Sequence, residues 1–163
     1  MLKIAIFVII HTVLEAYKAY SKIYDQVHER RQSTDIPFWV SEAMAASQPV
    51  LEIACGSGRI ALPIARQGIN IHGIDNSQEM IKLLEQRLSS EQKAVKDLLS
   101  YEITDMRTFG ENTTNKYGLA FVSFSALQYM HTREDQQTVF SAVHKALKPD
   151  GIFTVDVFNP NPA

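Results

Sequence analysis

The sequence predicts an α/β fold in which helices cover both faces of a parallel sheet. From residue 49 onward, short apolar runs of strand length alternate with segments that repeat apolar residues every three or four positions. Such strand–helix–strand units pair in parallel through right-handed crossovers. A glycine turn, Cys55-Gly56-Ser57-Gly58, lies directly between the first strand and its helix. We therefore expect a doubly wound, Rossmann-like sheet that binds ligands at the carboxyl ends of its strands.

The first half of this pattern contains a short helix and two strand–helix units. Residues 38–46 predict the short helix, which ends before Pro49. Strands are expected at residues 50–54 and 70–74, and Gly68 closes the helix between them, at residues 59–66. Ser77 is placed to cap the next helix, which carries apolar residues at helical spacing.

The second half contains three more strands and one long helix. Residues 91–100 indicate a polar helix end or connection. The further strands are predicted at residues 101–104, 119–124 and 152–158. Helical spacing over residues 133–147 predicts the long helix, and the turn Lys148-Pro149-Asp150-Gly151 leads into the last strand.

The first 48 residues differ from the rest. Residues 2–14 are almost wholly apolar after Lys3, as in a signal segment, but the run is shorter than the roughly 20 residues that span a bilayer. No small-residue cleavage site follows it, so we interpret it as an extra strand, a buried helix or a start codon assigned too early. Residues 15–31 predict a helix with one aromatic face. We expect residues 1–48 to form this apolar segment and N-terminal helices, and residues 49–163 to form the nucleotide-binding part of a single structural domain.

Composition narrows the possible partners. The chain has 163 residues, of which 45% are hydrophobic and 21% charged, with a formal net charge of -2. This balance is ordinary for a globular protein and gives no general attraction to nucleic acid or anionic lipid, so we expect neither partner. Cys55 is the single cysteine, which excludes an intrachain disulfide and a cysteine-based metal site, and we expect no metal. A reducing cytoplasm fits this cysteine usage best.

The glycine turn admits two nucleotide classes. Gly56, Gly58 and Ala61 satisfy the dinucleotide fingerprint, and Asp75 follows Gly56 by 19 positions. That interval is close to the spacing of about 20 expected for a ribose-binding acid. A nicotinamide oxidoreductase is therefore one interpretation, although a single pattern of this kind often occurs by chance.

Residues around the turn also resemble the class I S-adenosylmethionine-dependent methyltransferases, over roughly residues 20–160. Glu52 lies four positions before Gly56, where that family carries an acid that nicotinamide fingerprints do not require. Asp75 resembles the family's ribose-binding acid, and Asp105-Met106 resembles its adenine-binding position.

Two later segments carry the same resemblance. Leu147-Lys148-Pro149-Asp150-Gly151 resembles the family's turn before strand five, and Asp156-Val157-Phe158-Asn159-Pro160 resembles the strand ending of its small-molecule branch. The resemblance implies S-adenosylmethionine as cofactor and a small molecule as methyl acceptor. The cofactor-binding positions that it implies are Glu52, Ala54, Gly56, Ser57, Gly58, Asp75, Asn76, Asp105, Met106 and Phe124.

The chemistry of these residues suits that cofactor. Glu52, Asp75 and Asp105 make the rim acidic. An acidic rim attracts the cationic sulfonium of this cofactor and would repel the anionic pyrophosphate of a dinucleotide. The methionine carboxylate can meet the turn N–H groups, and the resemblance implies that Glu52 acts through hydrogen bonds near the methionine ammonium. Methyl transfer is an in-line displacement that depends on proximity and orientation, so the sequence identifies no catalytic residue.

Other residues have competing interpretations. Cys55 is expected to be a small buried residue beneath the turn rather than a nucleophile, because no histidine partner is evident. His131 is a candidate general base, but a solvated loop histidine is the commoner case. The resemblance places the N-terminal helix as a lid, in which Tyr24 could touch the cofactor.

The end of the sequence leaves the acceptor side open. Class I methyltransferases usually add strands six and seven after strand five, and here Ala163 follows shortly after the fifth predicted strand. A bare edge at that strand favours self-association. Three functions follow: an active small-molecule methyltransferase, a cofactor-binding but catalytically incompetent fragment or assembly partner, and, more remotely, an NAD(P)-dependent oxidoreductase.

Overall fold

The computed structural model describes residues 34–110 and 113–158. The predicted apolar segment at residues 2–14 and the predicted helix at residues 15–31 lie outside the described residues. The chain divides into two compact units, residues 1–35 and residues 36–163. The second unit contains the sheet and its helices.

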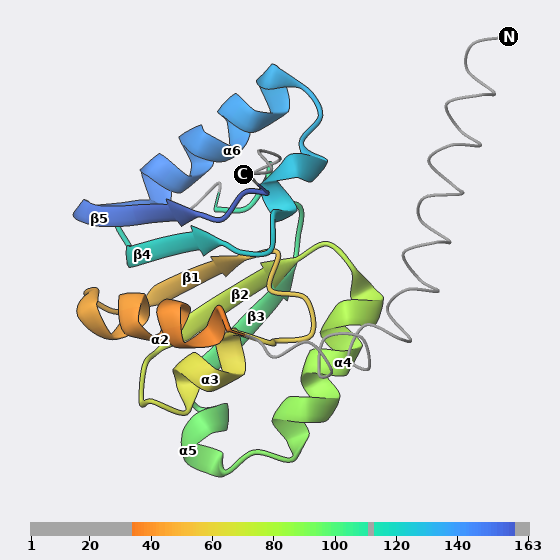
Figure 1. The fold of residues 1–163 in the computed structure, drawn as a ribbon, viewed down its shortest axis with the longest axis vertical. Coiled ribbons are helices and arrows are strands. Elements are labelled where there is room, and N and C mark those ends of the chain that lie inside the picture. Colours follow the sequence, from red (N-terminus) through yellow and green to blue (C-terminus); the bar gives the residue numbers. More distant parts are fainter. Residues whose placement is uncertain (1–33, 111–112, 159–163) are drawn as a thin grey trace, which may run out of the picture. The chain divides into compact units, whose positions relative to one another are not determined.

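Five parallel strands form one sheet in the order β3-β2-β1-β4-β5 (Figure 1). The strands are β1 (Val50–Ile53), β2 (Ile71–Asp75), β3 (Leu99–Ile103), β4 (Tyr117–Val122) and β5 (Leu147–Val155). Chain order runs outward from β1 to β3 on one side and then from β4 to β5 on the other, so the order reverses at β1. The predicted doubly wound parallel sheet is confirmed, and its switch point lies beside the glycine turn.

Helices pack on both faces of this sheet (Figure 1). They are α2 (Ile36–Ala45), α3 (Ala61–Ala65), α4 (Gln78–Ser89), α5 (Lys93–Lys96) and α6 (Arg133–Ala146), with a 3₁₀ turn η1 (Ala126–Tyr129). Trp39 of α2, Ile64 of α3 and Leu84 of α4 are buried in the core on one face. Val139 and Val143 of α6 are buried in the core on the other face. None of the helices in the described ranges has the length and hydrophobicity to cross a membrane.

Local sequence signals account for several element boundaries. Ser77 caps α4, and its side chain accepts a hydrogen bond from the Met80 amide, as predicted. Thr132 caps α6 in the same way through the Asp135 amide. α3 is shorter than predicted, because it begins at Ala61 rather than at residue 59.

The predicted start of the fifth strand is wrong. β5 begins at Leu147, which pairs with Tyr117, and the next pair is Ile152 with Leu119. The residues Lys148-Pro149-Asp150-Gly151 therefore form a bulge inside the strand instead of a turn before it. Burial explains the early start, since Tyr117 and Leu147 are both buried in the core against α6. The strand ends at Val155, before the predicted residue 158.

Candidate functional site

The glycine turn after β1 requires left-handed backbone at three positions. Ala54, Gly56 and Gly58 have φ angles of 60°, 54° and 75°. A Cβ at Gly56 would lie 3.0 Å from Met80 Cε, and one at Gly58 would lie 3.1 Å from Leu84 Cδ1. The two glycines therefore serve the packing of α4 against the turn as well as any ligand. Ala54 keeps a Cβ in a conformation that costs a non-glycine residue roughly 1–2 kcal/mol.

Asp75, the last residue of β2, holds this turn in place. Its Oδ2 accepts a hydrogen bond from the Gly56 amide at 2.8 Å, and its Oδ1 accepts one from the Ser77 amide at 2.8 Å. The residue is only 6% exposed, and burial raises the pKa of its carboxyl group despite these two hydrogen bonds. Each carboxylate oxygen has two lone pairs, so each oxygen retains one beyond these contacts.

Glu52 lies within β1, beneath the turn. It is 1% exposed and pairs in register with Gly73 of β2 and Phe121 of β4. Residues in register on parallel strands point to the same face, so Glu52 faces the side on which Trp39 stacks on Phe121 with ring centroids 4.7 Å apart. A carboxylate this deep in the core is costly unless it is paired or hydrogen-bonded.

Cys55 occupies the position expected of a small buried residue. Burial raises the pKa of its thiol well above the ordinary value, and the neighbouring Glu52 and Asp75 carboxylates raise it further. A Cβ at Gly73 would lie 2.7 Å from Cys55 Sγ, so the bare glycine on β2 makes room for this side chain. The thiol therefore lacks the thiolate character of a nucleophile.

Asp105 follows β3 and forms an ion pair with Arg107. Its Oδ1 accepts hydrogen bonds from the Arg107 amide at 2.8 Å and from Nε at 3.0 Å, and its Oδ2 accepts one from an Arg107 guanidinium nitrogen at 2.7 Å. These contacts hold the pKa of the Asp105 carboxyl below its ordinary value. Met106, the neighbouring apolar residue, is half-buried against the core on the α6 face. Sequence reasoning missed Arg107, although its position two residues after the acid was a usable signal.

The end of β4 carries the second set of strained residues. Phe124 and Ser125 have φ angles of 54° and 58°, which non-glycine residues rarely adopt. The Phe124 amide donates to Asp156 Oδ2 at 3.1 Å, and the Arg59 guanidinium lies 5.4 Å from the centroid of the Phe124 ring. Phe124 is 48% exposed. Backbone strain that the surroundings enforce is concentrated at functional sites.

These side chains belong to one rim of the sheet. Asp105, Asp75, the glycine turn and Phe124 follow β3, β2, β1 and β4, which are neighbours in the sheet. Ser57 is buried in the turn, and Asn76 is exposed between Asp75 and α4. His131 is exposed after η1, and Tyr24 lies outside the described residues.

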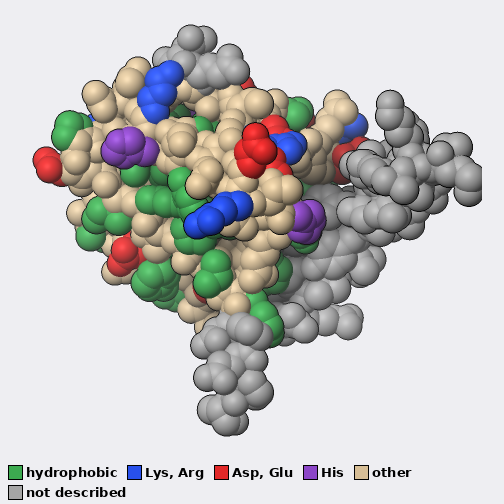
Figure 2. Space-filling model, turned by 90° about the horizontal axis from the view of Figure 1, so that it is seen from above, with side chains coloured by type: hydrophobic (Ala, Val, Ile, Leu, Met, Phe, Trp, Pro, Cys, Tyr) green, Lys and Arg blue, Asp and Glu red, His purple; other side chains and the backbone are tan. Residues whose placement is uncertain are grey.

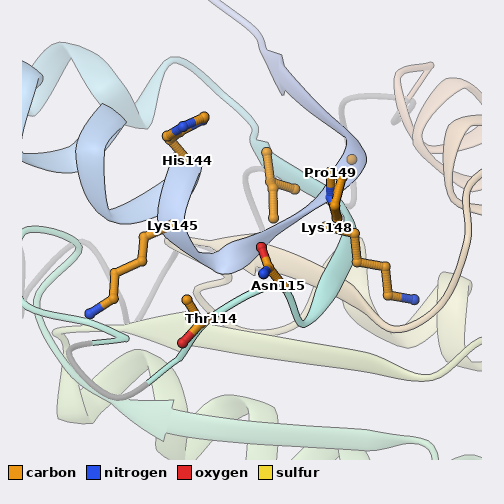
Figure 3. A pocket seen from close by; sticks show the side chains of 8 residues that line it. Thr114, Asn115, His144, Lys145, Lys148 and Pro149 are labelled. Atoms are coloured by element: carbon orange, nitrogen blue, oxygen red, sulfur yellow. The ribbon is translucent and has the colours of Figure 1, made fainter.

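A cavity of about 330 Å³ lies at the opposite end of the strands, where β4 and β5 begin (Figure 3). It is lined by Thr114, Asn115, His144, Lys145, Leu147, Lys148, Pro149 and Gly151. The amines of Lys145 and Lys148 extend to opposite sides of it rather than converging. Across the described residues, no group of three or more His, Cys, Asp or Glu side chains could hold a metal ion. The polar residues at the carboxyl edge are therefore the better candidate site.

Comparison with known protein families gives a match over most of the sheet. The model of the family described as "Methyltransferase domain" matches residues 50–151. This range begins at β1, contains the glycine turn, Asp75 and Asp105, and ends within β5. The match therefore covers the candidate site, the first four strands and the start of β5.

Curated proteins and a solved structure extend this comparison. The chain is 26% identical to the putative methyltransferase YqeM of Bacillus subtilis, over 86% of this chain and 55% of that protein. It is 25% identical to the ubiquinone biosynthesis O-methyltransferase of Psychrobacter cryohalolentis, over 75% of this chain and 45% of that protein. The glycopeptide N-methyltransferase MtfA, solved in complex with S-adenosyl-L-methionine, superposes with a TM-score of 0.67 at 22% identity, over 75% of this chain and 52% of that one. The chain spans about half the length of the curated relatives it matches.

Proposed function

The chain belongs to the methyltransferase domain family, and from that membership we propose that residues 49–163 bind S-adenosylmethionine and serve methyl transfer to a small-molecule acceptor. The observation that carries this proposal is the double hydrogen bonding of Asp75. Backbone amides of the glycine turn and of Ser77 fix its two oxygens, and each oxygen keeps a lone pair for a further donor. Two oxygens fixed in this way match the two vicinal hydroxyls of a ribose.

The remaining acids fit the other parts of the cofactor. Glu52, Asp75 and Asp105 come from three adjacent strands, and their negative charge favours a cationic ligand at this edge. We assign Asp75 to the ribose, Asp105 with Met106 to the adenine, and Glu52 to the methionine ammonium through intervening hydrogen bonds. Gly56, Ser57 and Gly58 present the turn backbone, Ala54 and Asn76 flank it, and Phe124 covers the end of β4.

The reaction needs little further chemistry from the protein. S-adenosylmethionine supplies a methyl group already activated by its sulfonium centre, so the chain mainly orients that cofactor and excludes water. A general base is needed only for an acceptor that must lose a proton. We place the protein in a reducing cytoplasm, which suits a chain whose single cysteine, Cys55, is a free thiol.

Calorimetry with two ligands tests the cofactor assignment. Saturable binding of S-adenosylhomocysteine, with no binding of NAD, is the expected result for the 163-residue chain. Asp75→Asn keeps the side-chain shape but replaces one acceptor oxygen by a donor, so it should weaken the affinity at least tenfold. Asp97→Asn removes a charge from an exposed ion pair with Lys93 and should leave binding unchanged. Saturable binding of NAD alone would mean an oxidoreductase instead.

A second function, cofactor binding without turnover, is supported by the outer edge of β5. In the described part of the chain β5 is an edge strand, and Ile152 on it and Phe140 on α6 are exposed. Figure 2 views the molecule from the α6 side and shows apolar side chains exposed between charged ones. Because the relatives are about twice as long, we propose that this edge is where the chain self-associates or pairs with further sequence. Methyl transfer that appears only in a version extended downstream would favour this second function.

A further inference from the structure

Arg107 donates three hydrogen bonds to the Asp105 carboxylate. Its amide and Nε donate to Asp105 Oδ1, and a terminal guanidinium nitrogen donates to Oδ2. The Arg107 side chain is 43% exposed, and that of Asp105 is 26% exposed. Such a fork-like contact fixes the plane of a carboxylate, which a single-point contact does not do.

The count of hydrogen bonds decides which Asp105 oxygen is available to a ligand. Oδ1 accepts two hydrogen bonds and Oδ2 accepts one, whereas each oxygen offers about two lone pairs. Among the described contacts, Oδ2 is thus the oxygen with room for another donor. Because Arg107 also lowers the pKa of this carboxyl, Asp105 is an acceptor only. An exocyclic amine suits such a group, whereas a 6-oxo group on a purine would be repelled.

A second acid, Asp135 of α6, also holds the Arg107 guanidinium. Its other terminal nitrogen donates to Asp135 Oδ1 at 3.1 Å, and Asp135 Oδ2 accepts from the Thr132 hydroxyl at 2.7 Å. The Thr132 hydroxyl also accepts a hydrogen bond from the Asp135 amide and so caps the start of α6. The guanidinium therefore lies between the loop after β3 and the first turn of α6, and both contacts restrict its orientation.

We propose that Arg107 determines the base specificity of the site by presenting Oδ2 of Asp105 to the exocyclic amine of an adenine. This inference rests on the proposed function and adds a residue to it. Asp105 touches the ligand, and Arg107 is a positioning residue that acts through Asp105. Loss of Arg107 then removes the preference for a 6-amino purine over a 6-oxo purine.

Two ligands that differ only at that position test the proposal. S-adenosylhomocysteine and S-inosylhomocysteine are titrated by calorimetry into the wild-type chain, Arg107→Ala, Arg107→Lys and Arg133→Ala. Wild type should prefer the adenosyl ligand by about tenfold or more, which is the range of a hydrogen bond to a charged group. Arg107→Ala should bring the two affinities within about twofold, chiefly by weakening the adenosyl ligand. Arg107→Lys keeps the charge without the fork and should restore part of the preference.

Comparing the two ligands on the same variant separates an effect on the orientation of Asp105 from a general loss of folding. A variant that folds less well weakens both ligands equally, so only a change in their ratio supports the proposal. Arg133 is exposed on the same first turn of α6, and Arg133→Ala should retain the wild-type ratio. If Arg107→Ala leaves the ratio of the two affinities unchanged, whether or not both fall, the role of Arg107 is overturned and the proposed function still stands. A wild-type chain that binds neither ligand would overturn the proposed function and this proposal together.

Discussion

The centre of the sheet and its β5 edge differ in how fully their side chains are covered by the rest of the described chain. At the β1–β2 side, all four β1 residues are buried and Asp75 is fixed by two backbone amides. At the β5 side, Ile152 is 54% exposed and Phe158, just beyond the strand, is 68% exposed. The proposed cofactor site is therefore built from contacts within the described chain, whereas the β5 edge leaves exposed apolar surface.

Truncating one aromatic residue in the buried centre of the sheet, on β4 beside β1, and one beyond β5 should give the largest contrast. Phe121 is fully buried and stacks on Trp39, so Phe121→Ala should lower the free energy of unfolding by about 3–5 kcal/mol. Phe158→Ala should change it by less than about 0.5 kcal/mol. Urea denaturation followed by circular dichroism measures both. Similar losses in the two variants would show that the β5 side is covered in solution and would remove the contrast.

Losing the carboxylate that joins β1 to β2 should have the next largest effect. Asp75→Ala leaves the Gly56 and Ser77 amides without their acceptor and should cost about 2–4 kcal/mol of stability. Asp156→Ala removes a single hydrogen bond to the Phe124 amide on the other side and should cost about 1 kcal/mol. The same denaturation experiment compares them, and a greater loss for Asp156→Ala would reverse the ranking of the two sides.

The buried position of Asp75 also predicts a pH dependence of binding. Burial raises its pKa above the ordinary 3.8, so on acidification this group takes up a proton earlier than an exposed aspartate does. Protonation removes an acceptor site, so affinity for S-adenosylhomocysteine should begin to fall at a pH above 3.8. Calorimetry between pH 7 and pH 4, with circular dichroism to confirm folding, measures this fall. In Asp75→Asn the remaining affinity should vary less with pH, and an equally steep profile would assign the titration to another group.

Relief of strain at the turn should give the smallest effect, and a favourable one. Ala54 has a φ of 60°, where glycine is tolerated without a Cβ clash. Ala54→Gly should raise the free energy of unfolding by about 0.5–1 kcal/mol, because glycine's greater freedom in the unfolded chain offsets part of the relief. Thermal denaturation detects this as a higher Tm, and a lower Tm would show that the Ala54 methyl group contributes packing that outweighs the strain.

Sequence patterns predicted those features that depend on neighbouring residues. The strand before the glycine turn, the Ser77 cap and the parallel topology all follow from local periodicity and short-range hydrogen bonding. The pairings of Arg107 with Asp135 and of Phe124 with Asp156 could not be predicted, because they join residues 28 and 32 positions apart whose proximity depends on the sheet order. The bulge in β5 was missed for the same reason, since the pairing of Leu147 with Tyr117 is set by burial against α6 rather than by the turn residues. The left-handed backbone of Phe124 and Ser125 carries no glycine to signal it.

An NMR titration of the 163-residue chain with S-adenosylhomocysteine tests the central claim most directly. The account predicts that the backbone amides of Gly56, Ser57, Gly58 and Ser77 shift on binding, together with that of Arg107 beside Asp105. The chemical shifts of amides around the cavity at the other end of the strands, such as those of Asn115 and Lys148, should not change. Shifts confined to that cavity, or no saturable shifts at the glycine turn, would contradict the assignment of the cofactor site.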